Sequence, residues 1–155
     1  MPQARWYVDA DTLGLGHILA LARPDVTFCG DDGQRKKRRL CLPPCVIQDT
    51  DADDDVWIPA VTREGLAIIT RDEHIQTRTN EINAVLASRA RMFAITSAGD
   101  LHNWDLLVIV ATRWRAMEVA ALESGPYIYS VTRTGMTKID PFRGRPPIVE
   151  GVGPE

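Results

Sequence analysis

The stretch Gly65-Leu66-Ala67-Ile68-Ile69-Thr70-Arg71-Asp72 contains the strongest structural signal in the chain. Residues 66–70 form a continuous and mostly apolar run, which is typical of a parallel strand buried on both faces. Gly65 closes a predicted helix over residues 55–64, and the carboxylate of Asp72 follows the strand directly. The stretch therefore predicts a helix, a buried strand and an acidic strand end in succession.

Predicted strands and helices alternate along most of the rest of the chain. This alternation favours an α/β fold, a three-layer α/β/α sandwich around a mainly parallel central sheet. In such folds the functional crevice lies at the carboxyl ends of the strands. The other predicted strands are 5–9, 26–29, 92–95, 127–132 and 136–139, and the other predicted helices are 12–22, 80–90 and 105–124.

Length and composition fit one globular domain, which we expect over residues 1–139, followed by a Pro/Gly-rich C-terminal tail over 140–155. The 155 residues are 45% hydrophobic and 25% charged, which excludes collagen-like, coiled-coil and wholly disordered chains. A net charge of -3 shows no overall basic surplus. The chain contains neither a signal-peptide pattern nor an apolar run long enough to span a membrane. An odd number of cysteines, three, favours reduced thiols and a cytoplasmic location.

Carboxylates follow two predicted strands and begin one predicted helix. Asp9 and Asp11 follow the first strand, Asp72 follows the strand at 66–70, and Asp54 stands where the intervening helix starts. Acids that converge in one crevice repel each other unless a cation is present, and oxygen ligands without nearby Cys or His suit Mg²⁺ or Mn²⁺. The alternative interpretation is that each aspartate only forms a turn or caps a helix.

Basic and aromatic residues provide candidate contacts to nucleic acid. The dense basic run comprises Arg35, Lys36, Lys37, Arg38 and Arg39, and Arg71 stands beside the last acidic strand end. These side chains can hold a phosphate backbone without reading its sequence, or can form a solvated loop and exposed salt bridges. We expect Trp104 and Trp114 in the core or in a dimer contact, rather than in a base-stacking platform, because they lie on an apolar helical face.

Three segments resemble the PIN-like domain, the nuclease fold of VapC-type toxins. They are Tyr7–Asp11, Asp54–Val61 and Gly65–Ile75, and the last, with its apolar strand ending in Thr-x-Asp, is the most specific. The resemblance spans about Trp6 to Ile95. It implies that Asp9, Asp54 and Asp72 are catalytic metal ligands, that Thr70 is the hydroxyl beside them, and that Asp11 replaces a polar neighbour. The spacing to Gly65 and Asp72 favours Asp54 over Asp55. The family's helix Glu between the first and later acids has no evident counterpart, so the chain resembles a reduced variant.

The resemblance implies a Mg²⁺- or Mn²⁺-dependent ribonuclease that hydrolyses RNA phosphodiesters without a protein nucleophile. For a VapC-type toxin it further implies a small antitoxin partner and a homodimer. A haloacid-dehalogenase-like phosphatase is an alternative, based on Asp9-Ala10-Asp11, Thr70 and Gly99–Asp105, but no lysine lies between the last two motifs. A non-catalytic PIN-like module that binds RNA or a partner is another, which the missing Glu favours.

Overall fold

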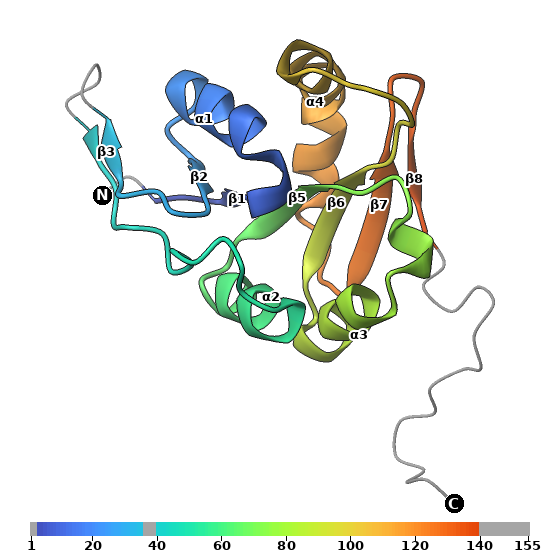
Figure 1. The fold of residues 1–155 in the computed structure, drawn as a ribbon, viewed down its shortest axis with the longest axis horizontal. Helices are drawn as coiled ribbons and strands as arrows, with labels where there is room; N and C mark the ends of the chain where they lie inside the picture. The colour runs from blue at the N-terminus through green and yellow to red at the C-terminus, as the bar shows by residue number, and fades with distance from the viewer. Residues whose placement is uncertain (1–2, 36–39, 140–155) are drawn as a thin grey trace, which may run out of the picture.

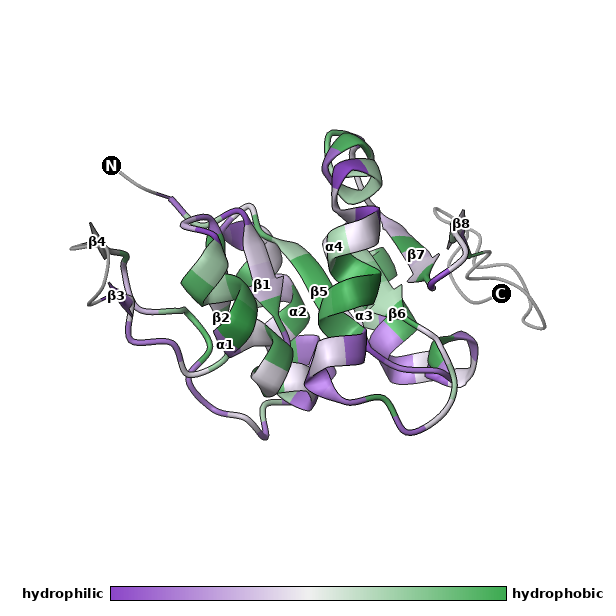
Figure 2. Ribbon diagram, turned by 90° about the horizontal axis from the view of Figure 1, so that it is seen from above, coloured by the Kyte–Doolittle hydropathy of each residue, from purple (hydrophilic) through white to green (hydrophobic). Residues whose placement is uncertain are grey.

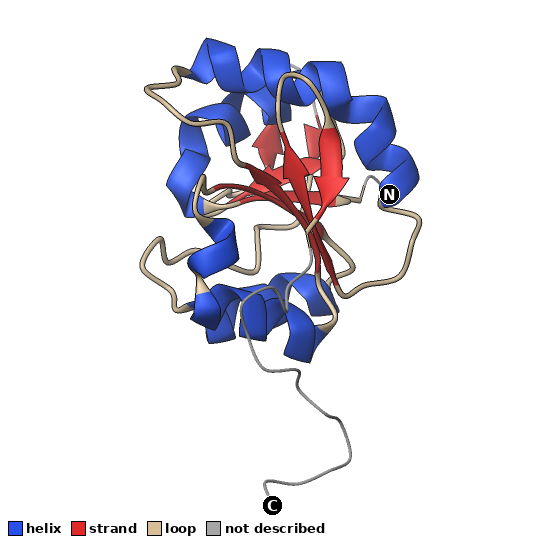
Figure 3. Ribbon diagram, turned by 90° about the vertical axis from the view of Figure 1, so that its right-hand side faces the viewer, coloured by secondary structure: helices blue, strands red, loops and turns tan. Residues whose placement is uncertain are grey.

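The computed structural model describes residues 3–35 and 40–139, which form one six-stranded sheet covered by helices on both faces (Figures 1 and 3). The sheet contains β1 (Trp6–Val8), β2 (Val26–Phe28), β5 (Ala67–Arg71), β6 (Arg91–Ile95), β7 (Tyr127–Val131) and β8 (Met136–Lys138). The helices are α1 (Leu13–Ala22), α2 (Asp54–Arg63), α3 (Thr79–Ser88) and α4 (Asn103–Ala120), with 3-10 turns η1 (Ala10–Thr12) and η3 (Ile75–Thr77).

The strand order is β2-β1-β5-β6-β7-β8, and every neighbouring pair is parallel except β7 with β8. This topology confirms the predicted α/β fold with a mainly parallel sheet. The final two strands, β7 and β8, pair with each other in antiparallel register. Within the described residues, no helix is both long and apolar enough to cross a membrane.

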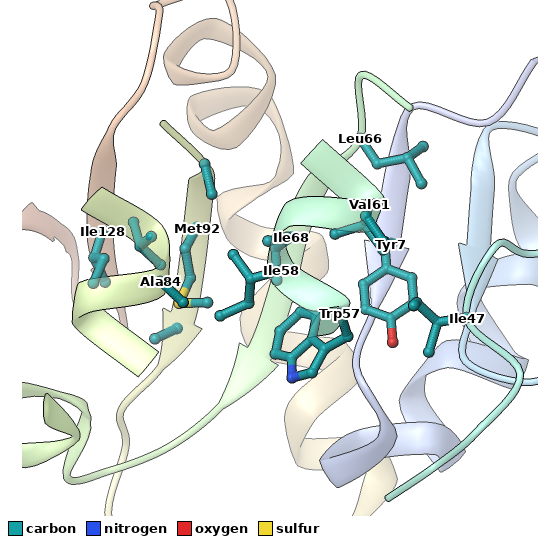
Figure 4. Close-up of a cluster of buried hydrophobic side chains, with 14 of the residues drawn as sticks. Tyr7, Ile47, Trp57, Ile58, Val61, Leu66, Ile68, Ala84, Met92 and Ile128 are labelled. Carbon is teal, nitrogen blue, oxygen red and sulfur yellow. The ribbon is translucent and has the colours of Figure 1, made fainter. Parts of the chain in front are cut away.

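Alternating side chains of the strands build two separate hydrophobic layers. Tyr7 and Ile68 face α2 and α3, whereas Val8 and Ile69 face α1 and α4. Figure 2 shows β5 in the green of hydrophobic residues, as a strand buried on both faces requires. Figure 4 shows Tyr7 and Trp57 side by side in the first layer, with their ring centroids 5.6 Å apart. Removing a large side chain such as Ile68 would cost about 2–5 kcal/mol.

The segment predicted to be a basic loop contains a short antiparallel pair, β3 (Gln34–Arg35) with β4 (Leu40–Cys41). Gly33 precedes this pair with a φ of +85°, and a Cβ at this position would collide with the Leu42 carbonyl. Only glycine tolerates both constraints, so the turn before β3 depends on it. Residues 36–39 and the predicted tail at 140–155 lie outside the described residues.

Candidate functional site

The carboxyl ends of β1 and β5 meet at one edge of the sheet, which we call the carboxyl edge. The strands are parallel with Val8 opposite Ile69, and the Asp9 amide donates to the Ile69 carbonyl at 3.0 Å. The Asp72 amide donates to the Ile95 carbonyl of β6 at the same distance. Adjacent parallel strands therefore bring Asp9 and Asp72 to one edge, although they are distant in sequence.

Asp9 caps η1 at this edge. Its Oδ1 accepts a hydrogen bond from the Ala10 amide at 2.7 Å and another from the Tyr7 hydroxyl at 3.5 Å. Burial raises the pKa of the Asp9 carboxyl to about 6, and the charge of Asp54 acts in the same direction. The two hydrogen bonds oppose this shift without cancelling it. A carboxyl whose pKa is raised by burial beside a second acid is a candidate functional group.

Asp11 is oriented by the end of β5. The Thr70 hydroxyl, which is fully buried, donates to Asp11 Oδ2 at 2.7 Å, and the Arg71 amide donates to Oδ1 at 3.4 Å. Although Asp11 reaches the surface, burial of its carboxyl raises its pKa to about 7, and the Asp9 charge adds to the shift. Asp11 therefore titrates near neutral pH.

Asp54 forms the first turn of α2. Its Oδ1 accepts a hydrogen bond from Trp57 Nε1 at 3.0 Å, and the positive end of the helix dipole favours a carboxylate there. Its charge raises the pKa of Asp9, so its carboxylate lies near that of Asp9. The neighbouring Asp55 is exposed and is not among the main causes of the raised pKa values at the carboxyl edge.

Asp72 is only about one-eighth exposed and is bound by groups that follow it in the chain. Its Oδ1 accepts the His74 amide at 2.9 Å, and its Oδ2 accepts Arg78 Nε at 3.1 Å. The Arg78 side chain is largely exposed, and an exposed partner contributes little net stability. Arg78 therefore neutralises Asp72 but can be displaced at low cost by another cation.

Glu81, in the first turn of α3, is the acidic residue that sequence reasoning missed. The side chain is buried, and among the described residues none donates a hydrogen bond to its carboxylate. Burial raises its pKa to about 8, and the charges of four other acids add to the shift, which places Glu81 among them. In decreasing order of effect these are Asp54, Asp72, Asp11 and Asp9. These five residues are hereafter the acidic cluster.

The sequence did contain a signal for Glu81. The resemblance to PIN-like domains placed the expected Glu between the first and later acids, whereas Glu81 follows Asp72. Glu81 precedes Ile82 and stands four residues before Val85, and both of these are buried. It therefore lies on the inward face of its helix, where an unpaired acid is unusual.

The acidic cluster has the right chemistry for a hard divalent cation but is not closed around one. All of its donors are carboxylate oxygens, which suit Mg²⁺ or Mn²⁺. Among the residues described, no group of three His, Cys, Asp or Glu side chains is arranged to hold a metal ion. Asp11 and Asp72 instead bind Thr70 and Arg78. Side-chain rotation is therefore needed before three oxygens can meet on one ion. Glu81, which is buried and receives no hydrogen bond from the described residues, is the feature that most favours a cation.

The basic residues predicted to contact RNA have different environments. Arg35 is buried, and both of its terminal nitrogens donate to the carboxylate of Asp31, at 2.8 and 2.7 Å. The prediction that Arg35 contacts RNA is therefore wrong in this structure, because the ion pair removes its guanidinium from solvent. Lys36, Lys37, Arg38 and Arg39 lie outside the described residues. Arg71 is half-buried at the carboxyl edge.

The two tryptophans of α4 also differ. Trp114 is buried, in agreement with the predicted core position, but Trp104 is 71% exposed. The prediction of an apolar contact for Trp104 is not met within this chain, because Trp104 lies on the outward face of α4, whereas Leu106 in the same first turn is buried.

The phosphatase alternative is disfavoured by its last acidic motif. Asp105 accepts the His102 amide at 3.0 Å, capping α4, and pairs with Arg133 at 3.0 Å. Asp100 is exposed. Neither residue is among the main causes of the raised pKa values of the acidic cluster, and Asp105 is held by His102 and Arg133, so the last motif does not join the other two.

These observations describe an α/β domain in which acidic side chains gather at the carboxyl edge of a mainly parallel sheet. Residues 38–97 match a protein-family model described as "PIN like domain". The matched segment contains Asp54, Asp72 and Glu81, and the match together with the architecture supports a PIN-like domain. No curated protein matches the chain, and no solved structure matches it.

Proposed function

We propose that this protein is a metal-dependent ribonuclease that hydrolyses RNA phosphodiesters at the acidic cluster. The single observation that carries the proposal is that Glu81 is buried, receives no hydrogen bond from the described residues and lies among four other acids, within a domain matched as PIN-like. Mutual repulsion and burial destabilise so many charges at one place unless a cation binds there. The PIN-like match supports nuclease chemistry over other uses of a divalent ion.

Asp9, Asp54 and Asp72 would hold Mg²⁺ or Mn²⁺, with Glu81 as a fourth carboxylate. A bound ion of this kind polarises phosphate oxygens, activates water and stabilises the leaving oxygen. The cost of assembling the site is reduced because Arg78, the partner of Asp72, is exposed. Glu81 holds a proton at neutral pH without a cation and gives it up when one binds.

The chain's own groups supply proton transfer and positioning. The Thr70 hydroxyl fixes Asp11 Oδ2, and a carboxyl whose pKa is near 7 can accept a proton from an attacking water at physiological pH. Arg71, beside Asp11 and Asp72, is placed to bind a phosphate of the substrate. These roles require no protein nucleophile.

An RNA-cleavage assay with and without Mn²⁺ tests this proposal. We expect cleavage that requires the metal, is abolished by EDTA and falls by at least about 100-fold in Asp72→Asn, because replacing an outer-shell partner of a metal alone costs 10–100-fold. Asp55→Asn is the matched control, since Asp55 is an exposed acid at the start of α2. Cleavage that survives EDTA and Asp72→Asn would refute the proposal.

A non-catalytic RNA-binding module is the second candidate, because no three acids are arranged to hold a metal in the described residues. In the same assay, RNA binding without cleavage at any Mn²⁺ concentration would favour it. The resemblance to VapC-type toxins extends the first proposal to a cytoplasmic homodimeric toxin whose antitoxin covers the carboxyl edge. Co-expression with the product of an adjacent gene and gel filtration would test these partners.

A further inference from the structure

Trp104 is an exposed tryptophan in a protein that buries its other three. Trp6, Trp57 and Trp114 are each less than a tenth exposed, whereas Trp104 is 71% exposed. Exposing a large aromatic side chain to water is unfavourable, and tryptophan is enriched where proteins contact ligands. Its position in the fold indicates which kind of ligand would cover it.

The first turn of α4 is fixed beside the carboxyl edge by a close contact with α1. The Asn103 carboxamide occupies the space that a Cβ on Gly14 would fill, so the Asn103 side chain packs directly on the backbone of α1. Gly14 follows Asp11 by one helical turn. Trp104, the next residue after Asn103, is therefore held at the same edge as the acidic cluster, on the α1 and α4 side of the sheet.

Arg71 connects the acidic cluster to the loop that leads into α4. Its amide donates to Asp11 Oδ1 at 3.4 Å, and its Nη2 donates to the Gly99 carbonyl at 2.7 Å. Within residues 3–35 and 40–139, its remaining guanidinium N–H groups have no hydrogen-bond partner. Arg71 is thus positioned between the acids and the Trp104 turn with donors left for a phosphate.

We propose that Trp104 stacks on a base of single-stranded RNA whose backbone phosphate binds Arg71 while an adjacent phosphodiester lies at the acidic cluster. This inference rests on the proposed function, since it assigns the position of that substrate. Stacking on an aromatic ring suits any base, but requires an unpaired one. The site would therefore select single-stranded over double-stranded RNA without reading sequence.

A second copy of the chain is a less suitable occupant of this surface. Val119 and Leu122 are the more strongly exposed apolar residues of this region and lie at and just after the opposite end of α4, whereas Val108, one turn after Trp104, is 40% exposed. Thr112 and Arg115, both exposed and polar, interrupt the apolar surface between the two ends. Trp104 and Val108 therefore form a small apolar patch that is separated from Val119 and Leu122, and Arg71 and the acids lie at the same edge of the sheet as Trp104.

Fluorescence titration with a short oligoribonucleotide in EDTA tests the inference without cleavage. We expect single-stranded RNA to quench the exposed tryptophan emission, and expect a duplex of the same sequence to quench it much less. By fluorescence anisotropy of labelled RNA, Trp104→Phe should bind close to wild type, while Trp104→Ala should bind about tenfold more weakly. Val119→Ala, at the far end of the same helix, is the control and should not change binding.

The outcomes separate this inference from the proposed function. If Trp104→Ala binds RNA as tightly as Trp104→Phe, the stacking inference is wrong, whether or not the wild type cleaves RNA. If tryptophan emission instead changes with protein concentration alone, and the change is lost in Trp104→Ala, the surface is a contact between copies and the inference is also wrong. If stacking is observed but Mn²⁺ produces no cleavage, stacking stands and the nuclease proposal fails.

Discussion

Asp31 and Glu81 are both buried carboxylates, and the protein accommodates them in opposite ways. Burial alone would raise the pKa of Asp31, but hydrogen bonds from Arg35, the Gly33 amide and the Thr27 hydroxyl hold it below its ordinary value. Glu81 receives no such bonds from the described residues, and its pKa is raised to about 8. Asp31 is neutralised by its partners in the fold, whereas the described residues supply no counter-charge for Glu81.

The difference separates a structural charge from a functional one. The Asp31 network joins the end of β2 to β3, and its charge is balanced within the chain. Glu81 lies among four further acids, so its ionisation adds to a local excess of negative charge. A bound divalent cation would neutralise that excess of negative charge and so stabilise the native state. The predictions below test whether the two acids behave as differently as their surroundings require.

The largest expected effect is the loss of the structural pair. Asp31→Ala would leave the Arg35 guanidinium buried without a counter-charge, and we expect a loss of about 3–5 kcal/mol in the free energy of unfolding, measured by urea denaturation. Asp32→Ala is the matched control, because Asp32 is exposed and, among the described residues, accepts a hydrogen bond only from the Gln34 amide. A loss below about 1 kcal/mol would mean that the pair contributes no more than a surface salt bridge.

Glu81→Gln should raise the free energy of unfolding, whereas Asp31→Ala should lower it. In metal-free protein at pH 8 we expect a gain on the order of 1–3 kcal/mol, because the substitution removes a charge that is costly to bury. The gain should vanish near pH 4, where the carboxyl is protonated in both states. Glu64→Gln, at an exposed site, should change little. Destabilisation of similar size at pH 8 would instead assign Glu81 a purely structural role.

The stability of the wild type should depend on pH in a defined direction. The pKa values of Asp9, Asp11 and Glu81 are raised to about 6, 7 and 8, so the native state binds more protons than the unfolded state above about pH 4. The free energy of unfolding of metal-free protein should therefore fall as pH rises from about 4 to 8. Mn²⁺ should raise the Tm more at pH 8 than at pH 5, because protons compete with the metal. A free energy of unfolding that does not change with pH, in the presence or absence of Mn²⁺, would contradict the raised pKa values of the acidic cluster.

The smallest expected effect concerns positioning of Asp11. Thr70→Val keeps the shape of the side chain but removes the donor to Asp11, and should cost about 0.5–1.5 kcal/mol. Because the Thr70 hydrogen bond lowers the pKa of Asp11, its loss should raise that pKa above about 7, which carbonyl-carbon NMR can follow. Thr62→Val removes a hydroxyl that, within the described residues, donates only to the Ile58 carbonyl of its own helix, and it should leave the pKa of Asp11 unchanged. An unaltered titration of Asp11 in Thr70→Val would show that this hydroxyl does not orient it.

The sheet could be predicted because local signals and tertiary structure agree there. The apolar run at 66–70 is a strand buried on both faces, and its acidic end lies at the predicted edge. Parallel pairing then accounts for the proximity of Asp9 and Asp72. Helical spacing likewise located α3 and α4 to within a few residues.

Three site features depended on contacts that a linear pattern does not reveal. Arg35 belongs to a basic run, yet it folds inward because Asp31 lies four residues earlier and the Gly33 turn brings them together. Glu81 was overlooked because its role arises from four acids contributed by other segments. Trp104 has helical spacing typical of a core residue, but it lies on the outward face of α4, opposite the buried Leu106, so its side chain is exposed.

Anomalous diffraction from crystals grown with Mn²⁺ would test the central claim most directly. The account predicts one anomalous peak at the carboxyl edge, within bonding distance of carboxylate oxygens from Asp9, Asp54 and Asp72, with Arg78 displaced from Asp72. A fully ordered carboxyl edge with no peak at saturating Mn²⁺, or with the only peak elsewhere on the protein, would contradict it.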